Sequence, residues 1–243
     1  MFLLAIMPQE VLDKVEANFR EPRAMITVSI MTLSNLDGSG KEVRISKTWV
    51  LKDYARMTKF LSPAGQRGVG VLIKHPGTPS EVIYLYLPAF RRVRRIASSS
   101  MKSSSFQGTD FSYSDLSSGL SYKKDYKATS VEVKKGPDGT VEEYVLTLVR
   151  KPGSHRPYSR IVLHVDSKFF IKKAELYDDK GLWKVLEVSK VKNFFGYNVP
   201  VSIAMKDLRR KHMTSIDIST VKINPPALKE SFFTIVNLRR PPK

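Results

Sequence analysis

The chain has 243 residues, 42% of them hydrophobic, which allows a sizeable core and excludes a chain that is disordered throughout. Its 41 Lys and Arg against 23 Asp and Glu give a net charge of +18, which indicates either an anionic partner (nucleic acid, phospholipid head groups or lipopolysaccharide-like polymers) or simply a basic solvated surface. The lack of cysteine excludes disulfides, thiolate metal sites, cysteine nucleophiles and a lipid-modified N-terminal cysteine.

The N-terminal residues predict a short apolar stretch followed by a helix. Met1 to Met7 is apolar, but it lacks a preceding basic segment and is shorter than a signal-peptide core. We interpret it as the remnant of a trimmed leader or an artificial start, and a native cytosolic N-terminus is the open alternative. A helix is expected from Pro8 to Arg20, because Pro8 suits a first turn and apolar residues recur on one face, at Val11, Leu12, Val15 and Phe19.

From Arg23 the apolar pattern takes a period of two, which predicts antiparallel strands joined by tight turns. Thr27 and Ser29 alternate with apolar residues, and the turn at 37–40 leads to a return strand. On this return strand one side carries Val43, Ile45, Trp49 and Leu51, and the other carries Arg44, Ser46 and Thr48. A third strand is expected near 54–61, the apolar segment 68–73 is of uncertain type, and 81–87 predicts a strand covered on both faces.

Residues 85–116 are the most distinctive stretch of the sequence. A strand leads into four arginines and a Ser-rich segment, 97–105, that we expect to be mobile. The arginines, Arg91, Arg92, Arg94 and Arg95, form either an edge strand protected by charge against aggregation or a rim that holds phosphate or carboxylate head groups. The following loop carries Phe106, Phe111 and Tyr113, which must pack on a core or leave an apolar patch for a partner.

From residue 129 onward the sequence predicts further hairpins, ending in a long strand at 212–223 and a short helical pattern at 228–236. The total is about ten or eleven strands in consecutive hairpins, with no repeat and no domain boundary. We therefore expect an α+β, mostly antiparallel fold, and one domain over residues 1–243. A sheet of this width twists and curls towards a barrel, so its concave face must be filled by a helix or by a ligand.

The residues offer little support for catalysis or metal binding. His75, His155, His164 and His212 are scattered without metal-ligand spacing, and neither a nucleophile elbow nor a nucleotide-binding loop occurs. Asp110 is five positions before Asp115, so they form either a carboxylate pair or, as we favour, separate caps or turns. We expect no catalytic residue, no metal and no cofactor.

Several short segments spread over the chain occur in an order that is found in a known family. The most specific is the aromatic loop 105–116, and the others are Thr48-Trp49-Val50, Phe60-Leu61-Ser62-Pro63, Tyr86-Leu87-Pro88-Ala89, residues 91–96, residues 161–166, residues 174–178, Gly196-Tyr197-Asn198-Val199-Pro200 and Phe232-Phe233-Thr234. In this order they resemble the outer-membrane lipoprotein-sorting proteins, the LolA-like group, and within it a subgroup with an Arg-rich strand and a Gly-Thr-Asp-Phe loop. Sorting members carry an Arg soon after the Trp-Val pair, where this chain has Leu51 and Lys52.

The resemblance implies a curved half-open barrel with helices capping an apolar cavity, and a non-enzymatic periplasmic role in carrying a lipid or the acyl chains of lipoproteins. We expect a mobile lid made of the 97–116 loop and the N-terminal helix. The anionic head-group rim would be Arg91, Arg92, Arg94 and Arg95. The expected lining of the cavity is Trp49, Phe60, Ile83, Leu85, Leu87, Phe106, Phe111, Tyr113 and Leu116.

Three alternatives stay open at this point. The same apolar residues could form an ordinary dry core without room for a ligand. The fold could serve as an envelope sensory or structural module that binds a protein or peptide, or as a nucleic-acid-binding β module, although no signature of the latter is present. For the carrier, the expected partners are lipid or lipoprotein acyl chains, an envelope membrane protein as donor or acceptor, and transiently a membrane surface, but not nucleic acid.

Overall fold

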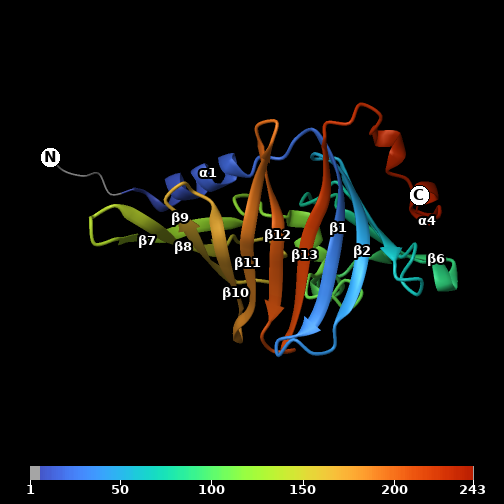
Figure 1. Cartoon of the computed structure of the whole chain (residues 1–243), viewed down its shortest axis with the longest axis horizontal. Coiled ribbons are helices and arrows are strands. Elements are labelled where there is room, and N and C mark those ends of the chain that lie inside the picture. The colour runs from blue at the N-terminus through green and yellow to red at the C-terminus, as the bar shows by residue number, and fades with distance from the viewer. Residues whose placement is uncertain (1–5, 243) are drawn as a thin grey trace.

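The structure, a computed structural model that describes residues 6–242, is built on one open antiparallel sheet of thirteen strands (Figure 1). The strand order is β6-β5-β4-β3-β2-β1-β13-β12-β11-β10-β9-β8-β7, so β6 and β7 are the free edges. The predicted fold class, a curved and mostly antiparallel half-barrel with few helices, is confirmed.

The strands follow the period-two pattern of the sequence, and turns with glycine at positive φ separate several of them. Their bounds are β1 (Ala24–Asn35), β2 (Glu42–Leu51), β3 (Ala55–Ser62), β4 (Gly70–Lys74), β5 (Val82–Leu87), β6 (Arg92–Ile96), β7 (Tyr126–Lys135), β8 (Val141–Arg150), β9 (Arg160–Asp166), β10 (Ile171–Asp178), β11 (Gly181–Phe194), β12 (Tyr197–Asp207) and β13 (His212–Ile223).

The chain path explains why the two halves of the sequence share one sheet. Strands β1 to β6 form a meander that ends at one edge, and β7 to β13 form a second meander that starts at the other edge. The two meanders meet in the middle, where β1 pairs with β13 from Met25↔Ile223 to Asn35↔His212. Residues 97–125, which we call the crossing segment, connect the two free edges.

One face of the sheet, which we call the inner face, is covered by α1 (Pro8–Asn18) and by the crossing segment with α2 (Ser99–Ser103) and α3 (Tyr113–Ser118). In Figure 1 the crossing segment is the green chain behind the central strands. The predicted apolar stripe of α1 is confirmed, since Val11, Leu12 and Val15 are fully buried against the β7–β12 half of the sheet. A second core lies between β1–β6 and the crossing segment, where Phe60 stacks on Phe106.

The opposite, outer face is covered in part by the C-terminal residues 225–242, with a 3₁₀ turn at Glu230–Phe232 and α4 (Ile235–Arg239). Phe233 and Leu238 are buried there against apolar residues of β1 to β4. The Nζ of Lys59, itself buried, donates to the carbonyl oxygens of Asn237 and Arg240 (2.8 Å to the latter), the acceptors that the end of a helix leaves free. This segment lies near β6, at the far end of the molecule from α1 and β7 (Figure 1).

The observed elements differ from the expected ones in the number of strands and in the stretch 97–105. The strand count is thirteen rather than ten or eleven, because the uncertain segment near 68–73 is β4 and the arginines continue the sheet as β6. The stretch 97–105, which we expected to be mobile, contains the short helix α2, capped by Ser98. Most of the apolar start, Met1 to Met7, lies outside the described residues.

Candidate functional site

A cavity of ≈ 310 Å³ lies between the inner face and the segments that cover it. This volume is at the lower end of the range of about 300–1,000 Å³ that small-ligand sites span. Its wall on the β9–β13 side is apolar, because the residues of these strands that point inward are Ile, Leu and Met. This wall consists of Ile161, Leu176, Leu186, Ile203, Met205, Ile216 and Ile218.

The opposite wall, on β1 to β3, is rich in hydroxyl groups. It presents Thr27 and Ser29 from β1, Ser46 and Thr48 from β2, and Thr58 from β3. The strand register places Thr27 opposite Thr48, Ser29 opposite Ser46, and Thr48 opposite Thr58. Residues directly opposite each other on one face lie close together, so these five side chains form one contiguous group, which we call the hydroxyl patch.

Charged side chains border the cavity near its mouth. The exposed members of the lining, Arg20, Gly119 and Ser121, mark where the cavity meets solvent. Below them, Arg56 of β3 forms an ion pair with Glu21 of the α1–β1 connection. The mouth is therefore bounded by both the sheet and its covering segments.

Two contacts hold the covering segments in place around the mouth. The Oε1 atom of Glu16 on α1 accepts hydrogen bonds from the backbone N–H of Tyr122 (2.8 Å) and of Lys123 (2.6 Å) in the crossing segment. Arg156 donates to Asp125 at 2.7 Å and to the carbonyl of Ser114 at 3.0 Å. The α1 helix, the crossing segment and the β8–β9 loop are thus tied to one another.

Three buried tyrosines form part of the lining, namely Tyr122, Tyr126 and Tyr158. The hydroxyl of Tyr158 donates to Asp115 at 3.0 Å, and that of Tyr126 to the carbonyl of Tyr158 at 3.1 Å. Burial raises the pKa of all three phenols, and the carboxylate of Asp115 raises that of Tyr158 further. This part of the wall therefore stays uncharged at physiological pH.

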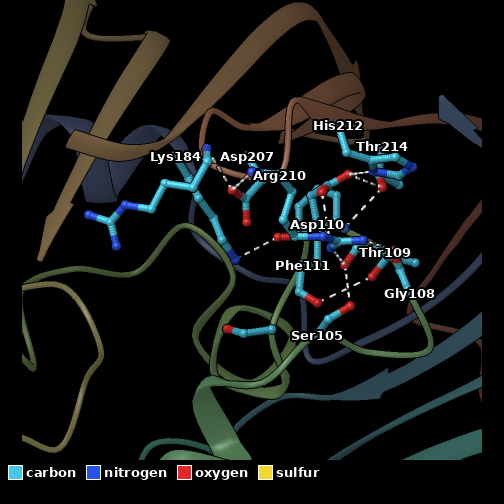
Figure 2. A network of polar contacts seen from close by, with 12 residues as sticks. Ser105, Gly108, Thr109, Asp110, Phe111, Lys184, Asp207, Arg210, His212 and Thr214 are labelled. Carbon is cyan, nitrogen blue, oxygen red and sulfur yellow. Dashed lines mark hydrogen bonds and ion pairs between the residues drawn. The ribbon is translucent and has the colours of Figure 1, made fainter. Parts of the chain in front are cut away.

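The Gly-Thr-Asp-Phe loop ends in a buried polar network around Asp110, shown in Figure 2. The carboxylate of Asp110, 1% exposed, lies 2.7 Å from the Nδ1 of His212, accepts from the Thr214 hydroxyl at 2.7 Å, and lies 3.3 Å from Arg210. The same Thr214 hydroxyl accepts from the Asp110 backbone N–H at 3.0 Å, and Lys184 donates to the Asp110 carbonyl at 2.7 Å.

The network joins the crossing segment to two strands of the sheet, since Lys184 belongs to β11 and His212 and Thr214 to β13. On the other side of the loop, Arg44 of β2 donates to the carbonyl of Gln107 at 2.6 Å. Asp115 has a separate role, because its side chain and that of Ser112 form the capping box of α3. The two aspartates are therefore anchors and caps, not a shared carboxylate pair.

The residues expected to line the cavity occupy three different places. Phe106, Phe111 and Leu116 of the crossing segment line it. Beside the cavity lies the core of the β1–β6 half, which contains Phe60, Ile83, Leu85 and Tyr113, with Leu87 packed against it. Trp49 is on the outer face, where its ring lies 5.3 Å from that of Phe232.

The four arginines expected at a head-group rim lie on or beside the edge strand β6. Arg91, Arg92, Arg94 and Arg95 are all exposed, and within residues 6–242 they form no ion pair or hydrogen bond through their side chains. None of them is part of the cavity lining. The pairing of Leu87 with Arg92 places Arg91 at one end of β5. The mouth of the cavity lies near the other end of this strand.

The hydroxyl patch and the apolar wall of β9 to β13 were not predicted from the sequence. The signal for the patch was present, since Thr27 and Ser29 on one strand, and Ser46 and Thr48 on the next, alternate with apolar residues. Alternation separates the two faces of a strand but does not say which face turns inward when both are covered.

No group of three or more His, Asp or Glu side chains among residues 6–242 is placed to hold a metal ion. No helix in that range combines the length and the hydropathy that crossing a membrane requires.

Comparisons with known proteins agree with this architecture. A family model whose description is that of an uncharacterized protein matches residues 52–240. A solved structure titled as an outer membrane lipoprotein-sorting protein domain, from Vibrio parahaemolyticus, is 26% identical with a TM-score of 0.80, over 95% of this chain and 97% of that chain. No curated protein matches the chain significantly.

Two further solved structures share the fold at lower identity. A DUF1329 family protein from Desulfovibrio piger is 24% identical with a TM-score of 0.84, over 95% of this chain and 97% of that one. A LolA superfamily protein from Nitrosomonas europaea is 20% identical with a TM-score of 0.74, over 95% and 98%. The chain therefore belongs to the family whose model matches residues 52–240, and its half-barrel with a covered inner face has the LolA-like fold of the outer membrane lipoprotein-sorting domain.

Proposed function

We propose that this protein is a non-enzymatic carrier that holds a lipid, or the acyl chains of a lipoprotein, in the cavity of the inner face. The observation that carries the proposal is the cavity of ≈ 310 Å³ with its apolar β9–β13 wall, covered by the crossing segment and by residues 19–22, which follow α1. Burial of an acyl chain contributes about 0.8 kcal/mol per methylene group, so even a partly enclosed chain binds without any covalent step.

The family likeness supports a place for this carrier in the bacterial envelope, and we propose the periplasm. Its exchange partners would be an envelope membrane protein that donates or accepts the lipid. For the lid, we propose that residues 113–122 move away from α1, because these residues cover the mouth and are held to α1 by Glu16.

We further propose that the β6 arginines contact anionic head groups outside the cavity. The supporting observation is that all four are exposed and lack an ion pair within the described chain. Basic side chains near an anionic membrane each contribute on the order of 1 kcal/mol of attraction, so four on or beside one strand bias the molecule towards such a surface.

The carrier proposal is tested by binding of a fluorescent fatty-acid probe to delipidated protein. We expect saturable binding by the natural chain and loss of binding in Ile203→Asp, which places a carboxylate in the apolar wall. The matched control is Ile30→Asp, a change of the same chemistry at a residue that is 42% exposed on the outer face. Natural protein that binds no probe, or an Ile203→Asp variant that binds normally, would contradict the proposal.

A further inference from the structure

Three residues of the patch are buried, and their hydroxyl groups have no protein partner. Thr27 is 5% exposed, Ser29 is 6% and Ser46 is 3%, and all three line the cavity. Among residues 6–242 their side chains form no hydrogen bond to the protein, whereas Thr48 and Thr58 bond to each other at 2.9 Å. None of the three oxygens is fully enclosed, so each is open to the cavity and free to bond to a polar group of a ligand there.

A second polar group beside the patch is also unpaired. The Nε of Arg56 is buried and has no hydrogen-bond acceptor in the described chain, although the guanidinium of the same residue pairs with Glu21. Arg56 is two residues before Thr58 on β3, so both side chains point to the inner face. The unpaired groups therefore continue from the mouth into the cavity along β3, β2 and β1.

The two walls differ in what they can bind. The apolar wall of β9 to β13 offers only dispersion and burial, which suits hydrocarbon. Each hydroxyl of the opposite wall can both donate and accept, which suits an ester or amide carbonyl and an adjoining hydroxyl. A plain hydrocarbon chain filling the whole cavity would leave the patch unpaired, which is unfavourable.

We propose that the cargo is an amphiphile whose ester or amide linkage enters the cavity with its acyl chain and bonds to the hydroxyl patch. The linkage lies just inside the mouth, against Thr27, Ser29 and Ser46, and the chain lies against the β9–β13 wall. This inference rests on the proposed carrier function and assigns it a class of substrate, glycerolipid-like acyl esters or amides, in place of unsubstituted hydrocarbon.

The test compares two competitors of a bound fluorescent fatty-acid probe. Monomyristoylglycerol carries an ester and two hydroxyls, whereas tetradecyl chloride has nearly the same chain without a strong hydrogen-bonding group. The full chain is expected to bind monomyristoylglycerol more tightly. In the variant Thr27→Val/Ser29→Ala/Ser46→Ala its affinity should fall by about tenfold or more, while that of tetradecyl chloride stays the same or rises.

A matched control separates the patch from general effects on the sheet. Thr32→Val makes the same change as Thr27→Val on the same strand, but the alternation of β1 places Thr32 on the outer face. Thr27→Val should weaken monomyristoylglycerol alone, and Thr32→Val should change neither ligand. Thermal unfolding of each variant checks that the fold is intact.

The outcomes distinguish this inference from the function on which it rests. If neither competitor displaces the probe, the carrier proposal itself fails. If both compete equally well and the triple variant affects both or neither, the protein is a carrier of hydrocarbon chains and the hydroxyl patch has no part in recognition.

Discussion

Asp110 shows how a residue that looks functional in the sequence can be a structural anchor. Its carboxylate is buried and bonded to His212 and Thr214 of β13, and it lies within 3.3 Å of Arg210. These contacts tie the crossing segment, which would otherwise be a long loop, to the middle of the sheet.

We predict that Asp110→Ala lowers the free energy of unfolding by about 3 kcal/mol, because removal of one partner leaves buried polar groups and cations unpaired. Urea denaturation of the variant and the natural chain measures the difference. Asp179→Ala, in an exposed hairpin turn, is the control and should have little effect. Equal stability of the two variants would show that the network contributes nothing.

Lys59 gives a prediction about pH. Burial, with a smaller effect of Arg240, lowers its pKa to about 8, against about 10.4 in an unfolded chain. Between about pH 8 and 10 the unfolded state therefore binds more protons than the folded state, and the contribution of Lys59 to stability rises with pH.

The corresponding measurement is the free energy of unfolding of the natural chain minus that of Lys59→Met, taken by urea denaturation from neutral pH to about pH 9.5. This difference in the free energy of unfolding should increase as the pH rises. A difference that is constant or falls over this range would contradict the lowered pKa.

Among the elements, the crossing segment and α1 are joined beside the mouth of the cavity. Glu16 on α1 is the acceptor for two backbone N–H groups of the crossing segment, at Tyr122 and Lys123, beside the mouth. Without these bonds residues 118–122 separate more often from the helix, so the mouth opens more frequently.

We predict that Glu16→Ala speeds release of a bound fluorescent fatty-acid probe several-fold, with a smaller change in equilibrium affinity because binding accelerates as well. Stopped-flow displacement measures the release rate. Glu10→Ala, which removes an exposed ion pair with Lys14 on the same helix, is the control. Equal release rates in the two variants would show that Glu16 does not hold the lid.

Most elements of the fold follow from the sequence, because period-two patterns and turn residues mark nearly every strand. The cavity lining does not follow as well, and β2 shows why. Its alternation separates Trp49 from Ser46 and Thr48, and a large ring is the natural choice for an interior. In the structure the C-terminal residues cover the outer face, so Trp49 is buried there and the hydroxyls face the cavity.

At the scale of the whole molecule, the sequence predicted hairpins of neighbouring strands but not the pairing of β1 with β13. No local pattern marks a contact between Met25 and Ile223, which depends on both meanders being complete. The same holds for the cavity, whose walls come from β1 to β4 and from β9 to β13. Both features depend on how the crossing segment carries the chain from one edge to the other.

The central position of β13 also has a consequence for biosynthesis. Until the ribosome has released residues 212–223, the edge of β1 that faces away from β2 has no partner strand. The two meanders of the half-barrel are then not joined. Contacts that span almost the entire chain form slowly, because closing so large a loop comes first. The polypeptide therefore reaches its final shape only after residues 212–223 have been released, and until then it exposes strand edges that a chaperone can bind.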